Sequence, residues 1–577
     1  SRTIGLPMDF QRIFILLGLA VTAYLIILAW NEDYGSGRKV VADLPDGTEF
    51  IAGNGDAARD ITEAVPTFDD SSSLDDVTDF IPTVEPESRR QTPTAETQVF
   101  NESRLVSVKS DLLHLTIDTL GGDIVKASLA AFPTTIDTPD SPFTLIDPGN
   151  SYAAQSGLIG KNGTDTSAGR PQFKVSSYNY SLREGESELQ VDFTLEQAEA
   201  TIIKRFTLRR SDYLIDVDYI VDNKSNEAWQ GALFAQIKRD RKAPIVSDEN
   251  AMGLQPYTGG ATFVSGTPYN KLEFDDIEEE SYKEKVDGGY IAMVQHYFVS
   301  AWVPKGDELN TYQARYLRQQ DVFLFGFTSP IWRVESGQQS SKGAQFYVGP
   351  KDQYRLEEIS PGLDLTVDYG FLWWLAQPLF FLLDTIHGMV GNWGIAIIGL
   401  TILVKTLLFP LSAAGFKSMA KMRKLQPEMA RLKERFGDDK QKFSQAMMEL
   451  YKKEGANPLG GCFPILLQMP VFLALYWALM ESVELRQAPF ILWIDDLSVM
   501  DPYFVLPILM GGSMFLTQLM QPEPPDPMQA KVMKLMPIMF TFFFLWFPSG
   551  LVLYWLVNNI LSAAQQFYVN KKVEAQP

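Results

Sequence analysis

The sequence predicts a polytopic α-helical membrane protein with six transmembrane helices, five of them in one core, and a large all-β domain outside the membrane. Apolar runs of membrane-spanning length follow one another after residue 391. Between about residues 98 and 368, apolar and polar residues alternate with the period of a β-strand. Residues 31–370 carry 31 basic and 55 acidic side chains, whereas the rest of the chain carries 19 and 16. This split places the acidic domain outside and the basic loops inside.

An apolar segment at residues 13–30 follows a short segment, residues 1–12, that ends in Arg12. A cleavable signal peptide is the alternative, but its apolar region is normally shorter, and no small-residue cleavage pattern follows here. We therefore interpret residues 13–30 as an uncleaved anchor with Arg12 on the inner side. Residues 31–97 are acidic and rich in Pro, Ser and Thr, which predicts a disordered tether because such a composition cannot bury a core.

Residues 98–368 are predicted to form an all-β sandwich. In residues 188–197 and 213–221 every second residue is apolar, and turns rich in Gly, Pro and Asn separate such runs. His114 or His296 could serve as a catalytic base in a pocket of this domain. No nucleophile or metal-ligand pattern accompanies either histidine, so we favour a structural role for both.

Residues 371–390 are apolar and aromatic, but Pro378 and Asp384 interrupt them. Together with the following apolar run they would be too long for one crossing, and a Gly-Asn-Trp-Gly stretch divides the two. We predict an amphipathic helix in the outer interface, with its tryptophans at headgroup level. A short additional span is the alternative.

The span at residues 392–416 carries one charge, Lys405, roughly 20 Å along the helix from its start. A lysine this deep costs at least a few kcal/mol unless it faces a bundle interior or a wet cavity. Snorkelling to the interface is less favourable, because about 12 residues separate Lys405 from the next lysine, Lys417. A buried ion pair would need an acid, and the other apolar segments hold none in their interiors, with Glu481 only at an end.

A basic segment, residues 417–457, follows this span. Residues 417–436 read as one charged helix ending before a glycine, and residues 438–454 read as a second that begins with two aspartates. Apolar residues at helical spacing would seat the hairpin on a partner or on the membrane. A solvated, positive-inside loop accounts for the sign of the charge but not for a hairpin of this length.

Four further spans complete six crossings, with both termini inside. The predicted spans are residues 462–480, 502–520, 532–547 and 551–568. The connecting segments are an outer loop, 481–501, an inner loop, 521–531, and an inner tail, 569–577.

Several motifs resemble the YidC family, the bacterial membrane protein insertases, in its Gram-negative form. They are GNWGIAIIGLTILVKTLLFPLSAAGFKSMAKMRKLQPEM, NPLGGCFPILLQMPVFLALYWALM, SVELRQAPFILWIDDLS and FFFLWFPSGLVLYWLVNN. The likeness is nearly unbroken from about residue 370 to 570 and looser over the rest. It implies that the outer domain is periplasmic and similar to mutarotase-like β-supersandwiches, and that core helices enclose a hydrophilic groove.

The resemblance also implies which residues line that groove. Its positive residue falls on Lys405, where many relatives have arginine, and Trp555 stands where a second tyrosine is common. For the aromatic residues and the methionine, ordinary helix packing is the alternative interpretation. The implied groove residues are Lys405, Thr401, Gln468, Met469, Phe472, Tyr554, Trp555 and Asn558.

These features predict insertion of membrane proteins into the bacterial inner membrane, without covalent catalysis. The single cysteine, Cys462, and three histidines leave little material for a metal site, and we expect no cofactor. The resemblance implies nascent membrane proteins, the Sec translocon, the translating ribosome and the bilayer as partners. A proton-coupled transporter would need intramembrane carboxylates, and a membrane-tethered sugar-active enzyme is a second alternative. The cations predicted to meet ribosomal RNA or capture substrate are Lys421, Arg423, Lys424, Arg431 and Lys433.

Overall fold

The computed structural model describes residues 104–242, 256–264, 266–436, 439–455, 463–521 and 527–574. All of them belong to one compact unit, residues 59–577. The predicted segment 1–12, anchor 13–30 and tether 31–97 lie outside the described residues, as does Cys462.

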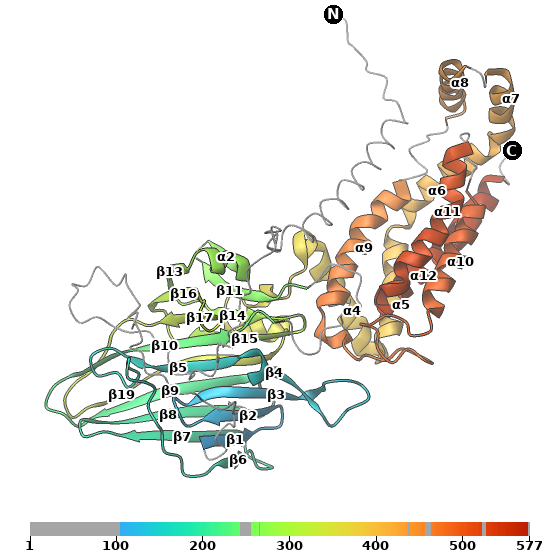
Figure 1. Ribbon diagram of the computed structural model, residues 1–577. Helices are drawn as coiled ribbons and strands as arrows, with labels where there is room; N and C mark the ends of the chain where they lie inside the picture. Colours follow the sequence, from blue (N-terminus) through green and yellow to red (C-terminus); the bar gives the residue numbers. More distant parts are fainter. Residues whose placement is uncertain are drawn as a thin grey trace, which may run out of the picture. The chain divides into compact units, whose positions relative to one another are not determined.

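The β domain consists of two sheets that pack face to face (Figure 1). The larger, 11-stranded sheet has the order β13-β16-β17-β10-β5-β3-β2-β1-β6, with β18 on β10 and β4 on β3. Its strands are β1 (Leu105–Lys109), β2 (Leu113–Asp118), β3 (Asp123–Pro133), β4 (Pro142–Ile146), β5 (Ala153–Ile159), β6 (Asn179–Ser181), β10 (Trp229–Arg239), β13 (Tyr282–Asp287), β16 (Leu309–Leu317), β17 (Val322–Thr328) and β18 (Trp332–Val334).

The second, 8-stranded sheet has the order β12-β11-β14-β15-β19-β9-β8-β7. All its pairings are antiparallel, as expected for strands joined by short turns. Its strands are β7 (Glu188–Glu196), β8 (Ala200–Arg209), β9 (Leu214–Asn223), β11 (Gly259–Val264), β12 (Thr267–Leu272), β14 (Ile291–Val294), β15 (Phe298–Pro304) and β19 (Gln339–Pro350).

The core of the domain lies between the sheets and follows from the alternation in the sequence. Val191 and Phe193 of β7 are fully buried, and so are Ile215 and Val221 of β9, whereas their polar neighbours mostly face outward. The prediction of a large all-β domain is confirmed. Two short helices, α2 (Phe274–Glu279) and α3 (Gln353–Ile359), complete it.

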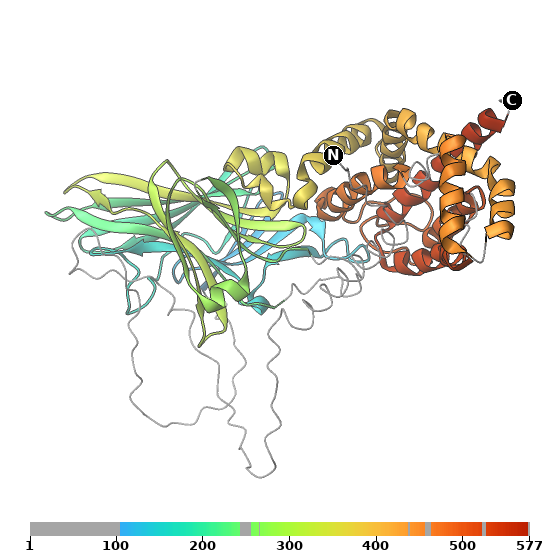
Figure 2. The ribbon, with the colours of Figure 1, turned by 90° about the horizontal axis from the view of Figure 1, so that it is seen from above.

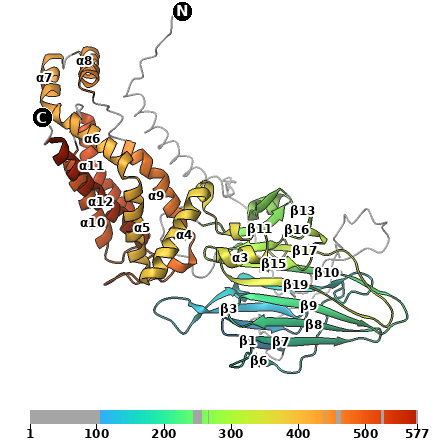
Figure 3. The same cartoon turned by 180° about the vertical axis from the view of Figure 1, so that it is seen from behind.

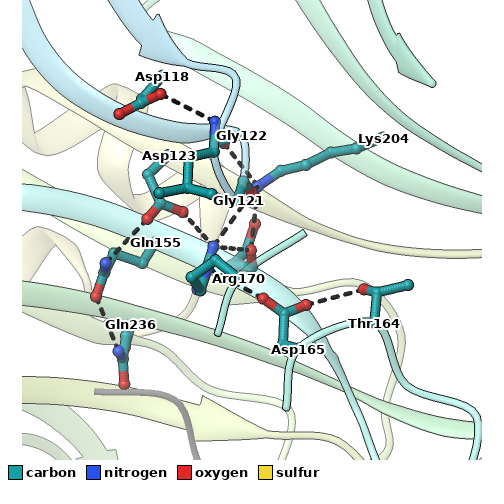
Figure 4. Close-up of polar contacts among 12 residues, drawn as sticks. Asp118, Gly121, Gly122, Asp123, Gln155, Thr164, Asp165, Arg170, Lys204 and Gln236 are labelled. Carbon is teal, nitrogen blue, oxygen red and sulfur yellow. Dashed lines mark hydrogen bonds and ion pairs between the residues drawn. The ribbon is translucent and has the colours of Figure 1, made fainter. Parts of the chain in front are cut away.

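An ionic cluster interrupts this apolar core (Figure 4). The guanidinium of Arg170 lies between two buried carboxylates, pairing with Asp123 and, at 3.0 Å, with Asp165. The Lys204 ammonium, which comes from β8 in the other sheet, donates to three backbone carbonyls, among them that of Gly121 at 3.0 Å. Gly121 has φ +76°, and a Cβ there would lie 2.4 Å from the guanidinium, so only glycine fits. The cluster therefore ties the sheets together through charge-assisted hydrogen bonds.

Lys204 should make stability depend on pH. Burial lowers its pKa to about 7, whereas an unfolded lysine titrates near about 10.4. Between these values the unfolded chain binds more protons than the folded chain, so the free energy of unfolding should rise as pH increases from about 7 to 10. Below about pH 7 the contribution of Lys204 should not change with pH. We expect the Tm of the β domain to rise by roughly 5 °C more in wild type than in Lys204→Met over that range, measured calorimetrically. Equal pH profiles would contradict this assignment.

The remaining helices form a bundle, which Figure 2 shows from above, and a separate pair of helices connected to it. Helix α12 is its central element and contacts α5, α6, α9 and α10. The helices are α4 (Trp373–Val390), α5 (Trp393–Leu407), α6 (Phe409–Lys424), α7 (Gln426–Phe436), α8 (Lys440–Lys453), α9 (Phe463–Glu481), α10 (Val505–Leu519), α11 (Pro527–Phe543) and α12 (Ser549–Glu574).

The segment expected to be one span, residues 392–416, is divided between α5 and α6, which meet at 69°. Pro410 in the first turn of α6 explains the break, because proline cannot donate the next helical hydrogen bond and its ring clashes with the preceding turn. Lys405 consequently lies in the last turn of α5. The predicted charged helix 417–436 is likewise divided near Leu425, ahead of Pro427.

Among the described residues, no helix taken alone has the length and hydropathy of a membrane span, whereas the bent pair α5–α6 taken together does.

A collar, residues 482–504, joins several helices at one end of the bundle. The side chain of Asn392, which caps α5, donates to the carbonyl of Phe490 at 3.0 Å. Ser549, which begins α12, donates its backbone N–H to the carbonyl of Val499 at 2.7 Å. Because these contacts bridge the starts of α5 and α12, the collar holds the two helices together at that end.

The β domain contacts the end of α9 through buried polar groups. Lys351 forms an ion pair with Glu481, and both side chains are almost fully buried. His296 lies 2.9 Å from the carbonyl of Met480. Burial lowers the pKa of His296 to about 3, so the ring is neutral and donates through Nε2. This contact gives His296 a structural role.

Candidate functional site

Helix α5 places Thr401 and Lys405 one turn apart on its buried side. Thr401 is 1% exposed and its hydroxyl donates to the carbonyl of Ile397 at 2.6 Å, so that proton is committed within its own helix. Lys405 is 8% exposed. Since the last turn of a helix presents free carbonyls, it is a favourable place for a cation.

The Lys405 ammonium contacts α12. Nζ donates to Ser562 Oγ at 2.6 Å, and Ser562 in turn donates to the backbone carbonyl of Asn558 at 2.7 Å. Within the described ranges, no carboxylate forms an ion pair with Lys405 and Ser562 Oγ is its only hydrogen-bond acceptor. Sequence reasoning missed Ser562, although its position one turn after Asn558 on a helix was a usable signal.

Asn558 also joins α12 to α9. Its side-chain amide exchanges two hydrogen bonds with the amide of Gln468, one of them from Asn558 Nδ2 at 3.3 Å. The structure thus links three of the expected residues, Lys405, Asn558 and Gln468, into one polar chain across α5, α12 and α9. We call this chain, together with Ser562, the polar brace.

The expected aromatic residues form a packed group beside the brace. Phe472 of α9 meets the ring of Trp555 edge-on, with centroids 4.5 Å apart, and stacks on Tyr554 at 6.4 Å. Tyr554 is 2% exposed and belongs to the bundle core, which fits the packing interpretation for that residue. Met469 differs, because it is 39% exposed and presents a flexible apolar side chain at the bundle surface.

Four buried polar atoms on α10 and α12 have no hydrogen-bond partner within the described part of the chain. Leaving such an atom unsatisfied costs about 1–3 kcal/mol, so a solvated or ligand-occupied interior is favoured around them. These atoms are Gln518 Oε1, Trp555 Nε1, Gln566 Oε1 and Asn570 Oδ1.

The five cations expected to bind ribosome or substrate lie on two helices. Lys421, Arg423 and Lys424 occupy the last turn of α6, and Arg431 and Lys433 lie on α7. All except Lys421 are exposed.

Helices α7 and α8 lie side by side as a separate hairpin (Figure 3). Met429 and Tyr451 are buried against each other, and the Tyr451 hydroxyl reaches the Met429 sulfur at 3.4 Å. The hairpin therefore has a small apolar core of its own.

No group of three or more His, Cys, Asp or Glu side chains in the described ranges could hold a metal ion.

Family models match nearly all of the described chain. A model described as 60Kd inner membrane protein matches residues 385–576, and one described as YidC periplasmic domain matches residues 105–382. A "Membrane protein insertase YidC" of Pseudomonas putida (strain W619) is 50% identical over 571 residues, covering 98% of this chain and 99% of the relative. A protein of the same description from Cellvibrio japonicus is 50% identical over 570 residues, with the same coverage of both chains.

Among solved structures, an active YidC insertase matches with a TM-score of 0.38 and 17% identity, covering 81% of this chain and 92% of that one. A galactose mutarotase related enzyme from Lactobacillus acidophilus matches with a TM-score of 0.29 and 10% identity, covering 42% of this chain and 97% of that one.

Proposed function

The chain belongs to the YidC family of membrane protein insertases, and from this premise we propose that Lys405 and the polar brace form the site that receives its substrates. The protein is an inner-membrane insertase with a periplasmic β domain, and its family is one of insertases rather than enzymes.

One observation carries the proposal. The Lys405 ammonium is buried between α5 and α12 with a serine hydroxyl as its acceptor, and no carboxylate of the described residues forms an ion pair with it. A buried cation without a counter-charge attracts anions more strongly than one in bulk water, because the surrounding dielectric is lower. An acidic residue in a polar substrate tail would supply the missing counter-charge. The site would therefore lower the cost of bringing such a tail into the bilayer.

The substrate's apolar segment needs a separate path. We propose that it leaves for the lipid along Met469 and the aromatic group around Phe472 and Trp555. Methionine adapts to different shapes and aromatic side chains offer large rigid surfaces, so this combination suits substrates of varied sequence. Buried polar atoms nearby, such as Trp555 Nε1, support an interior that admits water.

The proposed topology has six transmembrane helices with both termini in the cytoplasm. The first crossing is residues 13–30, and α4 lies in the periplasmic interface. The positive hairpin would be cytoplasmic, in keeping with the bias of Lys and Arg toward that side. The proposed partners are nascent membrane proteins, the Sec translocon and the translating ribosome.

Site-specific photocrosslinking tests the proposed site. A crosslinking residue at Met469 or Trp555 should capture a stalled nascent membrane protein. The control position is Leu516 on α10, which is 57% exposed and does not belong to the brace or the aromatic group. Equal capture at all three positions, or capture at Leu516 alone, would refute the assignment.

Neutralising the five cations of α6 and α7 together, by substitution with glutamine, should weaken ribosome association by roughly tenfold, because each lost phosphate contact reduces counterion release. The difference should be largest at low salt, because the electrostatic part of the binding falls as salt rises. Co-sedimentation with translating ribosomes measures it.

A control variant neutralises three cations of α8, which are Lys442, Lys452 and Lys453. Loop accessibility should show that both variants keep their orientation, since other cytoplasmic cations remain. Unchanged ribosome binding in the five-residue variant would mean that those charges serve only as topology signals.

A further inference from the structure

We propose that Ser562 is a positioning residue that holds the ammonium of Lys405 for an acidic substrate group. The inference rests on the proposed function, because Ser562 would position the charge of Lys405, and the role of that charge in receiving substrates is part of the proposal.

The hydrogen-bond directions at Ser562 support this assignment. A serine hydroxyl has one proton to donate and two lone pairs that accept. Its proton is committed to the carbonyl of Asn558 at 2.7 Å, so Oγ turns its lone pairs toward the Lys405 Nζ at 2.6 Å. The same bond that anchors the hydroxyl to its own helix thus orients it as an acceptor for the lysine.

Neighbouring polar groups do not duplicate this contact. Thr401 is one turn away on α5, but its hydroxyl donates to Ile397, and no hydrogen bond joins it to Lys405 among the described residues. The Gln468 and Asn558 side-chain amides bond to each other. Ser562 is therefore the group through which α12 fixes the ammonium.

Fixing the ammonium matters because a free lysine side chain samples many rotamers, and that freedom must be lost before the ammonium can be held in one place. An ammonium has three N–H donors, and Ser562 occupies one of them. The other two can be offered to a carboxylate without first ordering the side chain. The amide pair on α9 and α12 keeps the helix that carries Ser562 in register with its neighbours.

The experiment compares two substrates that differ only in an acidic or neutral translocated tail. The measured quantity is the ratio of their insertion rates in proteoliposomes. Ser562→Ala keeps the charge of Lys405 but removes the hydroxyl that holds its ammonium in place. The ratio should therefore fall about fivefold. Ser562→Thr keeps the hydroxyl and should retain the wild-type ratio. Ser562→Val has the shape of the threonine variant but no hydroxyl, so it should behave like the alanine variant.

Ser513→Ala is the matched control. Ser513 of α10 also donates to its own helix, to Met510 at 2.6 Å, and accepts from Asn559 of α12 at 3.2 Å, without contacting Lys405. Its loss removes a comparable contact between helices and should leave the substrate ratio unchanged.

The outcomes separate this inference from the function on which it rests. If Lys405→Ala lowers the ratio but Ser562→Ala and Ser562→Val do not, Ser562 only packs and the inference fails. A fall of equal size in Ser513→Ala would also overturn it, because a general loosening of the bundle would then suffice. If Lys405→Ala leaves the ratio unchanged, the electrostatic role of Lys405 itself is refuted. Should Ser562→Ala fail to accumulate, the Thr and Val pair decides.

Discussion

Lys405→Glu is expected to abolish insertion of substrates whose translocated tails are acidic. At about 4 Å and an effective dielectric constant of 20, two unit charges interact by about 4 kcal/mol, and the substitution turns this attraction into repulsion. Burial of Lys405 limits screening by salt, so the effect should persist at physiological ionic strength. Protease accessibility of the substrate tail, after synthesis in the presence of the variant, measures insertion.

Two variants at the same position separate charge from shape. Lys405→Arg keeps the charge and should retain insertion. Lys405→Ala should be partly active, because nearby polar groups such as the Gln468 and Asn558 amides remain to keep the interior hydrated. Equal activity of the Glu variant and wild type on an acidic-tailed substrate would rule out an electrostatic role for this residue.

Arg170→Met is expected to cause a large loss of stability in the β domain. It removes the cation from between Asp123 and Asp165, whose side chains are 6% and 1% exposed. Breaking a buried ion pair from one side typically costs about 3–5 kcal/mol, because a charge is left buried and uncompensated. For a domain of this size the Tm should fall by roughly 10 °C. Calorimetry of the full-length protein in detergent measures it.

Arg205→Met provides the matched control. Arg205 pairs with Asp192 at 2.7 Å, but the two side chains are 33% and 40% exposed. Such a pair contributes about 1 kcal/mol or less, so its Tm should change little. Equal shifts in the two variants would mean that the ionic cluster has no special place in the stability of the domain.

The Arg170 variant also tests whether insertion by the helix bundle depends on the stability of the β domain. Every residue of the polar brace lies on α5, α9 or α12, outside the β domain. We therefore expect Arg170→Met to keep insertion largely intact at temperatures where the helices remain folded. Loss of insertion in step with unfolding of the β domain would show that the bundle depends on it, for instance through Lys351 and Glu481.

Local patterns in the sequence determined several features of the structure. The alternation around Val191 and Phe193 predicted strands that the sheets contain, because successive side chains of a strand point to opposite faces. The unpaired Lys405 in an apolar run indicated a polar interior, because a lone charge in hydrocarbon is costly. The motifs of the last 200 residues identified the family.

Only the tertiary structure decided which side chains meet. Lys405 and Ser562 are 157 positions apart, and Gln468 and Asn558 are 90 apart, so no local period relates them. The same holds for Arg170 and Lys204, whose charges no sequence pattern places in a β-sandwich core. Periodicity depends on the few residues around each position, whereas these contacts depend on how helices and sheets pack. The sequence alone therefore determined the family and the presence of a large β domain, and packing determined the partners of Lys405.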